Sequence, residues 1–410
     1  GGMSMNEFRP VLRFAALSDV HYQDAPTAER ARMALALQSA YVCAERCPHH
    51  KRLDAVAVVG DFANSGSEAQ MQAFRRTLDE NLRDGTRAIL SVASHEFGDS
   101  GAEGAAEKLA RIFNQPPDVH EVINGFHFIS VSPSKGTEFD QAKRSWAARA
   151  LAAAAAEDPQ KPIFFFQHPH ISDTVYGSIN WGNDDLSAIL MHYPQVIDFS
   201  GHSHAPINDP RSIHQRHFTS LGCGTLSYFE LDEFDKYYGT VPPESERAAQ
   251  LLLVEADAQN RVRITPYDLI TGQAFFAPWE IERPSEPGSF VYTSEKRRAV
   301  DTAPYFDQGA SLAVTEITAT GATLTFDQAR TESYRVNDYI IRLRRAADGA
   351  IARQYALWSQ YFLQEMPQTL SLALRELVPG TEYLTEISAR SFWDTPSANK
   401  LCGSFQTLCK

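Results

Sequence analysis

Cysteine, membrane-length apolar runs and positive charge are all scarce in this chain of 410 residues. Its five cysteines are an odd set without a Cys-x-x-Cys pair, which argues against a disulfide framework and against cysteine-ligated zinc. No apolar run has the length of a transmembrane helix, so no membrane partner is expected. The formal net charge of −13 argues against a broad nucleic-acid surface. A small phosphate-bearing substrate is compatible with this charge, because bound metal ions supply positive charge locally.

The amino-terminal stretch "GGMSMNEFRPVLRF" lacks a basic segment followed by an apolar one, so a secretory signal peptide is not expected. We therefore expect a cytoplasmic protein. Hydrophobic residues make up 43% of the sequence and charged residues 22%, as in ordinary globular proteins. A chain of this length exceeds one ordinary hydrophobic core, which predicts two or more domains. Nothing in the composition indicates an oligomeric state.

Apolar runs of strand length alternate with helical patterns from residue 11 to about 270. The runs lie at 11–17, 53–59, 87–93, 126–131, 162–167 and 195–200. Amphipathic patterns between them lie near 27–46, 67–83, 103–113, 141–156 and 184–193. Buried strands separated by helices predict an α/β fold with helices on the faces of its sheet. We expect the segments 213–221, 250–255 and 261–268 to be antiparallel strands that complete a second sheet.

The character of the sequence changes near residue 275. The stretch "APWEIERPSEPGSF" is rich in proline and charge and is typical of a connector. Short alternating strands follow at 312–318, 322–327, 338–344, 370–374 and 382–390. Their spacing predicts an all-β sandwich. We therefore expect an α/β domain over 11–275, a connector over 276–306 and a smaller β-sandwich domain over 307–410.

The segment "LVPGTEYLTEISA" resembles the fibronectin type III pattern. The resemblance places Leu377, Pro379, Thr381 and Tyr383 at the corner before a core strand, with Tyr383 as the corner tyrosine. It covers about the last quarter of the chain.

Asp, His or Glu follows five of the predicted strands at the point where each strand ends. These blocks are Ser18-Asp19-Val20-His21, Gly60-Asp61-Phe62, Ser94-His95-Glu96, His168-Pro169-His170 and Gly201-His202-Ser203-His204. Each block alone is more often a turn, a helix cap or a core histidine. Ligands of an open α/β sheet bind outside the carboxyl ends of its strands. All five blocks at that one edge therefore indicate a functional site.

The mixture of imidazole and carboxylate groups suits zinc, manganese or iron, whereas an all-oxygen set would suit magnesium or calcium. Two ions roughly 3.5–4 Å apart need a bridging carboxylate and separate ligands around each ion. Such a pair clamps a phosphoryl group and activates water for in-line attack.

The ordered blocks resemble those of the calcineurin-like metallophosphoesterase family: D-x-H, G-D, G-N-H-[DE], H and G-H-x-H. All but one of them match, over about residues 11–270. The resemblance implies a four-layer αββα fold with two transition-metal ions, Mn, Fe or Zn. Asp19, His21 and His204 would bind the first ion, His168 and His202 the second, and Asp61 would bridge them. A metal-bridging hydroxide would be the nucleophile, with His95 as general acid oriented by Glu96.

The third block departs from the family pattern. Ser94 occupies the position of an asparagine that ligates the second metal, and Ala93 stands where glycine is usual. Because a serine hydroxyl is a shorter and poorer ligand, we expect a weaker second site, or one completed by water.

Three functional hypotheses follow. The first is a metal-dependent hydrolase acting on a small phosphate monoester or diester. The second is a degenerate phosphoesterase fold that binds a ligand or partner without turnover, and Ser94 speaks for it. The third makes the carboxy-terminal sandwich an adhesion or carbohydrate-binding module, for which the aromatic residues to examine are Trp358, Tyr361, Phe362 and Trp393.

A few further residues stand outside the metal-binding motifs. Tyr176, Asn180, Trp181 and Asn183 either line a substrate pocket or belong to a packed surface loop, and the loop is the favoured interpretation. The motifs assign no role to His170, His214 and His217, which we expect to be solvated or in the core.

Overall fold

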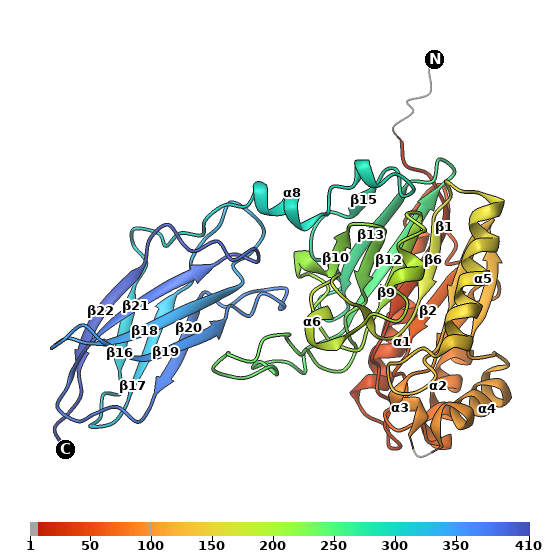
Figure 1. Cartoon of the computed structure of the whole chain (residues 1–410). Coiled ribbons are helices and arrows are strands. Elements are labelled where there is room, and N and C mark those ends of the chain that lie inside the picture. The colour runs from red at the N-terminus through yellow and green to blue at the C-terminus, as the bar shows by residue number, and fades with distance from the viewer. Residues whose placement is uncertain (1–6, 99) are drawn as a thin grey trace. The chain divides into compact units, whose positions relative to one another are not determined.

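The computed structural model describes residues 7–98 and 100–410 (Figure 1). The chain divides into two compact units. Unit 1 runs as far as Asp232 and continues over Glu244–Ser294. Unit 2 comprises Glu233–Pro243 and Glu295–Lys410, so a short stretch that interrupts unit 1 in the sequence belongs to unit 2.

The first large sheet of unit 1 has the strand order β14-β13-β12-β1-β2-β3, with β15 paired to β13. β1, β2 and β3 are parallel, whereas β12 and β13 are antiparallel to their neighbours. The strands are β1 Pro10–Leu17, β2 Ala55–Val59, β3 Arg87–Ser91, β12 Gln250–Asp257, β13 Val262–Asp268, β14 Gln273–Ala274 and β15 Trp279–Ile281. The segments at 250–255 and 261–268 thus extend this sheet, rather than completing the second one.

The second large sheet of unit 1 has the order β10-β11-β9-β6-β5-β4. Its strands are β4 Val119–Ile123, β5 Phe126–Ser130, β6 Ile163–Phe166, β9 Val196–Ser200, β10 Ile213–Gln215 and β11 Thr219–Gly222. The segment 213–221, expected as one antiparallel strand, forms two, and β11 runs parallel to β9. A small ladder pairs β7 (His170–Ile171) with β8 (Gly182–Asn183).

A phenylalanine-rich core lies between these two sheets. β1 presents Leu12, Phe14 and Ala16 to this core, and Ala15 and Leu17 to the core on its other face. The Phe14 ring meets four rings of the second sheet edge-on, at centroid distances from 4.9 to 5.9 Å: Phe128, Phe164, Phe166 and Phe199. Because both faces of β1 are buried, its sequence is a continuous apolar run without alternation.

Helices contribute to the cores on the other faces of both sheets. Met33, Phe74 and Leu109 pack on the first sheet from α1, α2 and α4. Leu151 and Leu190 pack on the second sheet from α5 and α7. The helices are α1 Ala28–Glu45, α2 Glu68–Asn81, α3 Ser94–Phe97, α4 Gly101–Phe113, α5 Gln141–Glu157, α6 Ser178–Trp181, α7 Ser187–Leu190 and α8 Ser294–Ala299, with 3-10 turns at Pro210–Ser212 and Pro287–Ser289.

Side-chain caps fix where the longer helices begin. The Ser67 hydroxyl accepts the Gln70 N–H at the start of α2, and the Asp140 carboxylate accepts the Lys143 N–H at the start of α5. The helix expected at 184–193 is reduced to the single turn α7. Within the described residues, no helix combines the length and the apolar character that crossing a bilayer requires.

Unit 2 consists of two small antiparallel sheets around one core. Their orders are β16-β17-β20 and β19-β18-β21-β22. The strands are β16 Leu312–Thr315, β17 Ala322–Asp327, β18 Asp338–Arg345, β19 Ile351–Trp358, β20 Thr369–Leu374, β21 Glu382–Arg390 and β22 Leu401–Gln406. Tyr383 is buried, and its hydroxyl accepts the Val378 N–H at 3.0 Å. This bond to the chain just upstream is the one that a corner tyrosine makes.

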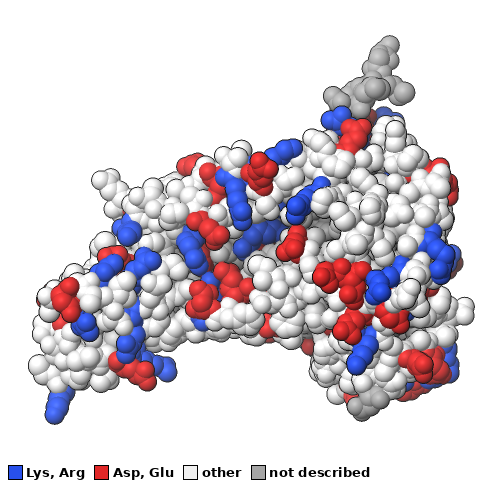
Figure 2. Space-filling view, viewed as in Figure 1, with Lys and Arg blue, Asp and Glu red and all other residues white. Residues whose placement is uncertain are grey.

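Charged side chains of both signs are interspersed on the face of the molecule shown in Figure 2.

Candidate metal centre

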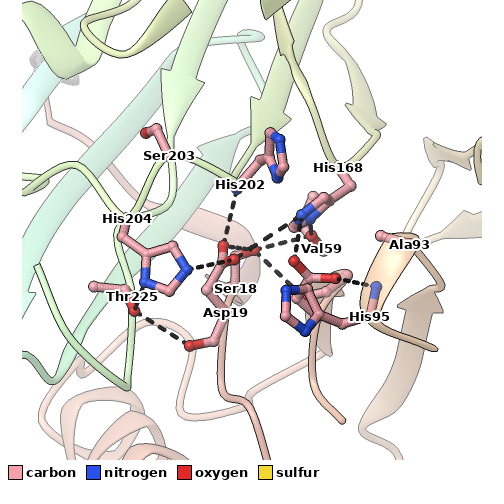
Figure 3. Close-up of polar contacts among 12 residues, drawn as sticks. Ser18, Asp19, Val59, Ala93, His95, His168, His202, Ser203, His204 and Thr225 are labelled. Carbon is pink, nitrogen blue, oxygen red and sulfur yellow. Dashed lines mark hydrogen bonds and ion pairs between the residues drawn. The ribbon is translucent and has the colours of Figure 1, made fainter. Parts of the chain in front are cut away.

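The predicted site residues of unit 1 meet where β1, β2, β6 and β9 end (Figure 3). In the part of the chain that the structure describes, three groups of side chains could hold a metal ion, and within each group the ligand atoms lie within 4.8 Å of one another. These groups are Asp19, His21 and His204; Asp61, His168 and His202; and His21, Asp61 and His95. Because His21 and Asp61 each belong to two groups, the three groups form one continuous cluster.

The backbone of the cluster adopts a conformation that side chains rarely allow. Five of its residues have φ between 53° and 76°: Asp19, His21, Asp61, His202 and His204. Such left-handed conformations persist in non-glycine residues only where the surrounding structure enforces them. Here the loops are bonded to one another: Asp19 N–H to the Gly60 carbonyl at 3.2 Å, and Gly201 N–H to the His168 carbonyl at 2.8 Å.

Two glycines allow the loops to approach this closely. A Cβ atom on Gly201 would lie 2.1 Å from the Ser18 Oγ and 2.7 Å from the Asp19 Oδ2. A Cβ atom on Gly60, whose φ is +82°, would lie 2.6 Å from the His168 Nδ1. The glycines of the Gly-Asp and Gly-His blocks are therefore steric requirements of the site.

The first group converges on one oxygen of Asp19. Its Oδ1 lies 3.2 Å from the His204 Nε2 and 3.5 Å from the His21 Nε2. Its Oδ2 instead accepts the Ser18 hydroxyl at 2.6 Å and the His202 N–H at 2.9 Å, which fixes the carboxylate (Figure 3). Burial raises the pKa of Asp19, but the charges of His204 and His168 together with hydrogen bonds to the His204 and His21 rings outweigh it and hold this pKa well below its usual value.

The second group centres on His168 and Asp61. The His168 Nε2 lies 2.8 Å from the Asp61 Oδ2 and 4.0 Å from the Asp19 Oδ1. Burial lowers the pKa of His168, but the Asp61 and Asp19 carboxylates raise it to about 10. Burial, with the neighbouring His168, lowers the pKa of His202 to about 4. Positive charge is therefore stabilised between Asp61 and Asp19, where a metal cation would take the place of the proton.

Two histidines of the cluster donate a hydrogen bond from Nδ1 to a backbone carbonyl, which leaves the Nε2 atom of each ring facing the cluster. The His168 Nδ1 donates to the Val59 carbonyl at 2.6 Å, and the His204 Nδ1 donates to the Tyr228 carbonyl at 2.9 Å. Metal-binding histidines characteristically donate their second N–H in this way, which fixes the tautomer.

Several inward-facing donor atoms lack the partners that a closed polar core would supply. The Nε2 atoms of His21 and His204 face each other at 3.2 Å. Among the described residues, the buried Asp19 Oδ1 and His168 Nε2 make ion-pair contacts inside the cluster but no hydrogen bond of regular geometry. Buried polar atoms are rarely left so. Converging imidazole and carboxylate donors of this kind fit transition-metal ions.

His95 lies beside the cluster with its ring held by a backbone carbonyl. The His95 Nδ1 donates to the Asn64 carbonyl at 2.6 Å, and the ring meets the His21 ring edge-on at 4.5 Å. The Asn64 side chain also reaches His21, with 3.3 Å between Oδ1 and Nδ1. Asn64 thus fixes both rings, although no motif pointed to it beyond its place three residues after Asp61.

Glu96 has a different role from the one expected, which was to orient His95. Its buried carboxylate accepts the N–H groups of Asp61 at 2.8 Å, Ala63 at 3.1 Å and Ala93 at 3.0 Å. Glu96 therefore ties the loop after β2 to the end of β3. The His95 ring, which Glu96 was expected to orient, is instead held by Asn64. Burial and the nearby Asp61 charge raise the pKa of Glu96 well above its usual value.

Ser94 opens the short helix α3 immediately before His95 and is half-buried. Its hydroxyl makes no hydrogen bond to another described residue. Its backbone neighbour Ala93 is buried and lies beside the Glu96 carboxylate.

Aromatic rings flank the two histidines of the last block. The Tyr228 ring lies 4.3 Å from the His204 ring, and the Trp181 ring meets the His202 ring edge-on at 5.2 Å. Sequence reasoning missed Tyr228 and favoured a packed loop for Trp181. That interpretation suits Asn180, whose amide donates to the Asp232 carboxylate at 2.5 Å, and Tyr176, whose hydroxyl accepts the Asp232 N–H.

The remaining residues singled out in the sequence do not belong to the three donor groups. Asn183 accepts the Asp185 N–H at 2.8 Å. His214 and His217 line a separate pocket of about 290 Å³ with Met191, Arg216 and Phe218. His170 is buried next to the last block.

Comparisons with known proteins were made for the whole chain. No protein-family model matches the sequence, and no curated protein matches it. Among solved structures, the purple acid phosphatase PPD1 from yellow lupin seeds is 14% identical with a TM-score of 0.46, covering 67% of this chain and 54% of that one. A redesigned β-sandwich protein is 24% identical over 27% of this chain and 93% of that one, with a TM-score of 0.21.

A fibronectin type III domain of human collagen XX is also similar. It is 22% identical, with a TM-score of 0.19, over 26% of this chain and 95% of that one. At such identities and TM-scores, similarity assigns neither a family nor an activity to this chain.

Proposed function

We propose that unit 1 is a metallophosphoesterase-like hydrolase whose strand-end cluster holds two transition-metal ions. The observation that carries the proposal is the pair of adjoining donor groups, in which the His168 Nε2 lies 4.0 Å from the Asp19 Oδ1 at the centre of the first group. Two sheets with a shared core and helices on their other faces support the four-layer αββα fold that we propose for the unit.

The proposed ligands of the two ions correspond to the donor groups described above. Asp19, His21 and His204 would hold one ion, and His168 and His202 the other. Asp61 belongs to groups with both His21 and His168, which supports a bridging role. Ions bound here would supply positive charge to a phosphoryl group and activate water as its nucleophile.

His95 is the proposed general acid. Because its Nδ1–H is committed to the Asn64 carbonyl, its Nε2 is the atom that can pass a proton to the departing alcohol. After that transfer the neutral ring keeps its bond to Asn64, so its orientation does not change during turnover. This positioning needs no rearrangement of the backbone.

Burial indicates the side from which a substrate approaches. Asp19, Asp61 and His168 are buried, whereas His95 and His202 are partly exposed. The partly exposed Trp181 ring flanks His202, and the partly exposed Tyr228 ring flanks His204. A small phosphate ester would thus reach the ions past these rings, with its leaving group toward His95.

A binding protein without turnover is the second candidate, and Ser94 favours it. The hydroxyl at this position is a weaker donor than the carboxamide that the family pattern has there. Of the four aromatic residues that motivated the carbohydrate-binding hypothesis for unit 2, Trp358, Tyr361 and Phe362 are buried and Trp393 is partly exposed, so these four do not form an exposed row of rings.

Hydrolysis of an aryl phosphate monoester and an aryl diester, with added Mn²⁺, Zn²⁺, Fe²⁺ or Mg²⁺, separates the two candidates. The hydrolase proposal predicts turnover with Mn²⁺, Zn²⁺ or Fe²⁺ that is lost in Asp61→Asn. Metal binding without turnover of either ester would support the binding protein instead.

A further inference from the structure

His170 is buried beside the last block and is hydrogen-bonded at both ring nitrogens. Its Nδ1 lies 2.7 Å from the Ser200 Oγ, and its Nε2 lies 2.6 Å from the Ser203 Oγ. It belongs to β7, two residues after His168, and the residue as a whole is only 1% exposed. None of the three donor groups of the cluster includes it.

The surrounding bonds fix the direction of each hydrogen bond. The Ser200 hydroxyl donates to the Leu221 carbonyl at 3.4 Å, so it accepts the Nδ1–H of His170. With the ring proton of a neutral His170 on Nδ1, its Nε2 is an acceptor, so the Ser203 hydroxyl donates to it while accepting the Ala205 N–H at 3.2 Å. A neutral imidazole supplies the one donor and one acceptor that this network requires.

Ser203 is the residue between the two histidines of the last block. His202 and His204 have φ of 76° and 59°, so the turn that carries them is held in an uncommon conformation. The chain packs tightly around the His170–Ser203 pair: a Cβ atom on Gly177 would lie 2.6 Å from the Ser203 Oγ and 2.9 Å from the His170 Nε2. A shift of Ser203 would therefore carry both neighbouring rings with it.

We propose that His170 is a positioning residue, which holds Ser203 so that the His202 and His204 rings point at the metal cluster. The inference rests on the proposed function of that cluster. His170 contributes no ligand atom. It determines the geometry of two ligands through one hydroxyl, in the manner of the outer partners of metal-binding histidines.

The two ring nitrogens can be tested separately, because the carboxamide of Gln reaches the Nε2 position and that of Asn the Nδ1 position. His170→Gln keeps an acceptor for Ser203, whereas His170→Asn keeps only the bond to Ser200. His170→Phe removes both. Mn²⁺ affinity of the full chain is measured by titration calorimetry, and thermal unfolding of the metal-free protein is measured in parallel.

We expect His170→Asn and His170→Phe to weaken Mn²⁺ binding by roughly 10- to 100-fold, as the loss of outer partners does elsewhere. His170→Gln should stay within a few-fold of the parent. Ser203→Ala should weaken binding as much as His170→Asn, and the double variant should lose little more. His127→Phe is the matched control: it removes a buried histidine bonded to Glu157 at 2.8 Å and should leave Mn²⁺ affinity unchanged.

Parental Mn²⁺ affinity in all three His170 variants would overturn the inference while leaving the metal site intact. Equal losses in the Gln, Asn and Phe variants, matched by equal falls in metal-free stability, would also overturn it, because the role would then be structural. A parent protein that binds no Mn²⁺ would overturn the proposed function and this inference together.

Discussion

The Nε2 atom of His168 lies 2.8 Å from the Oδ2 atom of Asp61, and the two side chains are only 1% and 2% exposed. A carboxylate and an imidazole buried together at this distance need a proton or a metal cation between them. The neighbouring Asp19 carboxylate adds to this requirement, since it also raises the pKa of His168.

Ser94→Asn should tighten the second metal site. A carboxamide reaches further than a hydroxyl and offers a stronger neutral oxygen, so less Mn²⁺ should be needed for half-maximal activity. The parent should hold about one ion per chain at low Mn²⁺ and approach two with excess, since catalysis by such sites requires both ions. A parent that already binds two ions tightly, with Ser94→Asn changing neither curve, would contradict this prediction.

His95→Ala should slow turnover without releasing metal. The loss in kcat should approach the 10²- to 10⁴-fold typical of general acid–base groups for esters with poor leaving groups, and be smaller for good ones. Rates for a series of aryl and alkyl phosphates, with metal content of the same samples, test this. Because His95 forms a donor group with His21 and Asp61, loss of an ion from His95→Ala would instead identify it as a ligand.

Gly201→Ala should disrupt the cluster, because the added methyl would lie 2.1 Å from the Ser18 Oγ. Overpacking of this kind costs about 1–3 kcal/mol, to be measured by urea unfolding of the metal-free protein. Displacement of Asp19 should also weaken metal binding. Gly288→Ala is the control, since nothing lies within 4 Å of its added Cβ, and the prediction fails if the two variants behave alike.

Asp198→Asn should change the pH dependence of stability. Asp198 is buried on β9, its Oδ1 accepts the Gln167 amide at 3.1 Å, and burial raises its pKa to about 7. The folded state then holds a proton that the unfolded state releases above its ordinary pKa of 3.8. Asp198 should therefore contribute a loss of stability in the parent as pH rises from about 4 to about 7, by up to about 4 kcal/mol, and no further loss above that range.

The Asn variant removes this titration. Urea unfolding of metal-free parent and Asp198→Asn at pH 5 and pH 8 isolates the contribution, because the other titrating groups are common to both proteins. A stability difference between the two proteins that is the same at both pH values would show that Asp198 does not titrate in this range.

The positions of the cluster residues could be predicted from the sequence because the end of an apolar run marks the end of a buried strand. Asp19, Asp61 and His168 each follow an apolar run, and parallel strands bring their carboxyl ends to one edge. Asn64 could not be found in this way, since it acts on His95 through a backbone carbonyl that no residue type encodes. Tyr228 contacts His204 only through the fold of a long loop.

Several elements were missed because their side chains do not alternate clearly. β4 carries His120 and Glu121 on a short strand, and β19 begins with the mostly exposed residues 351–354. Of the expected helix at 184–193 only Ser187–Leu190 is helical, and just before it the Asp185 carboxylate accepts the N–H of the distant Phe139. Local propensity was overridden by contacts distant in the sequence.

No sequence pattern could predict that Glu233–Pro243 belongs to unit 2. Lys236 of this stretch is buried, forms an ion pair with Asp338 at 3.0 Å and lies 4.3 Å from the Trp358 ring centroid. A lysine is rarely buried without such partners, and only the folded chain brings them together. The stretch 276–306, predicted as a connector, is instead divided between the units: 276–294, including β15 of the first sheet, belong to unit 1, and 295–306 belong to unit 2.

The most direct test of the central claim is the number of metal ions per chain at saturating Mn²⁺, in the parent and in Asp61→Asn. Among the described residues, Asp61 is the carboxylate that shares donor groups with both His21 and His168, so its loss should affect both ions. We predict two ions per chain in the parent, and at most one weakly held ion in Asp61→Asn, by calorimetric titration and elemental analysis. Two tightly bound ions in Asp61→Asn, or none in the parent, would contradict a two-metal centre at the strand ends.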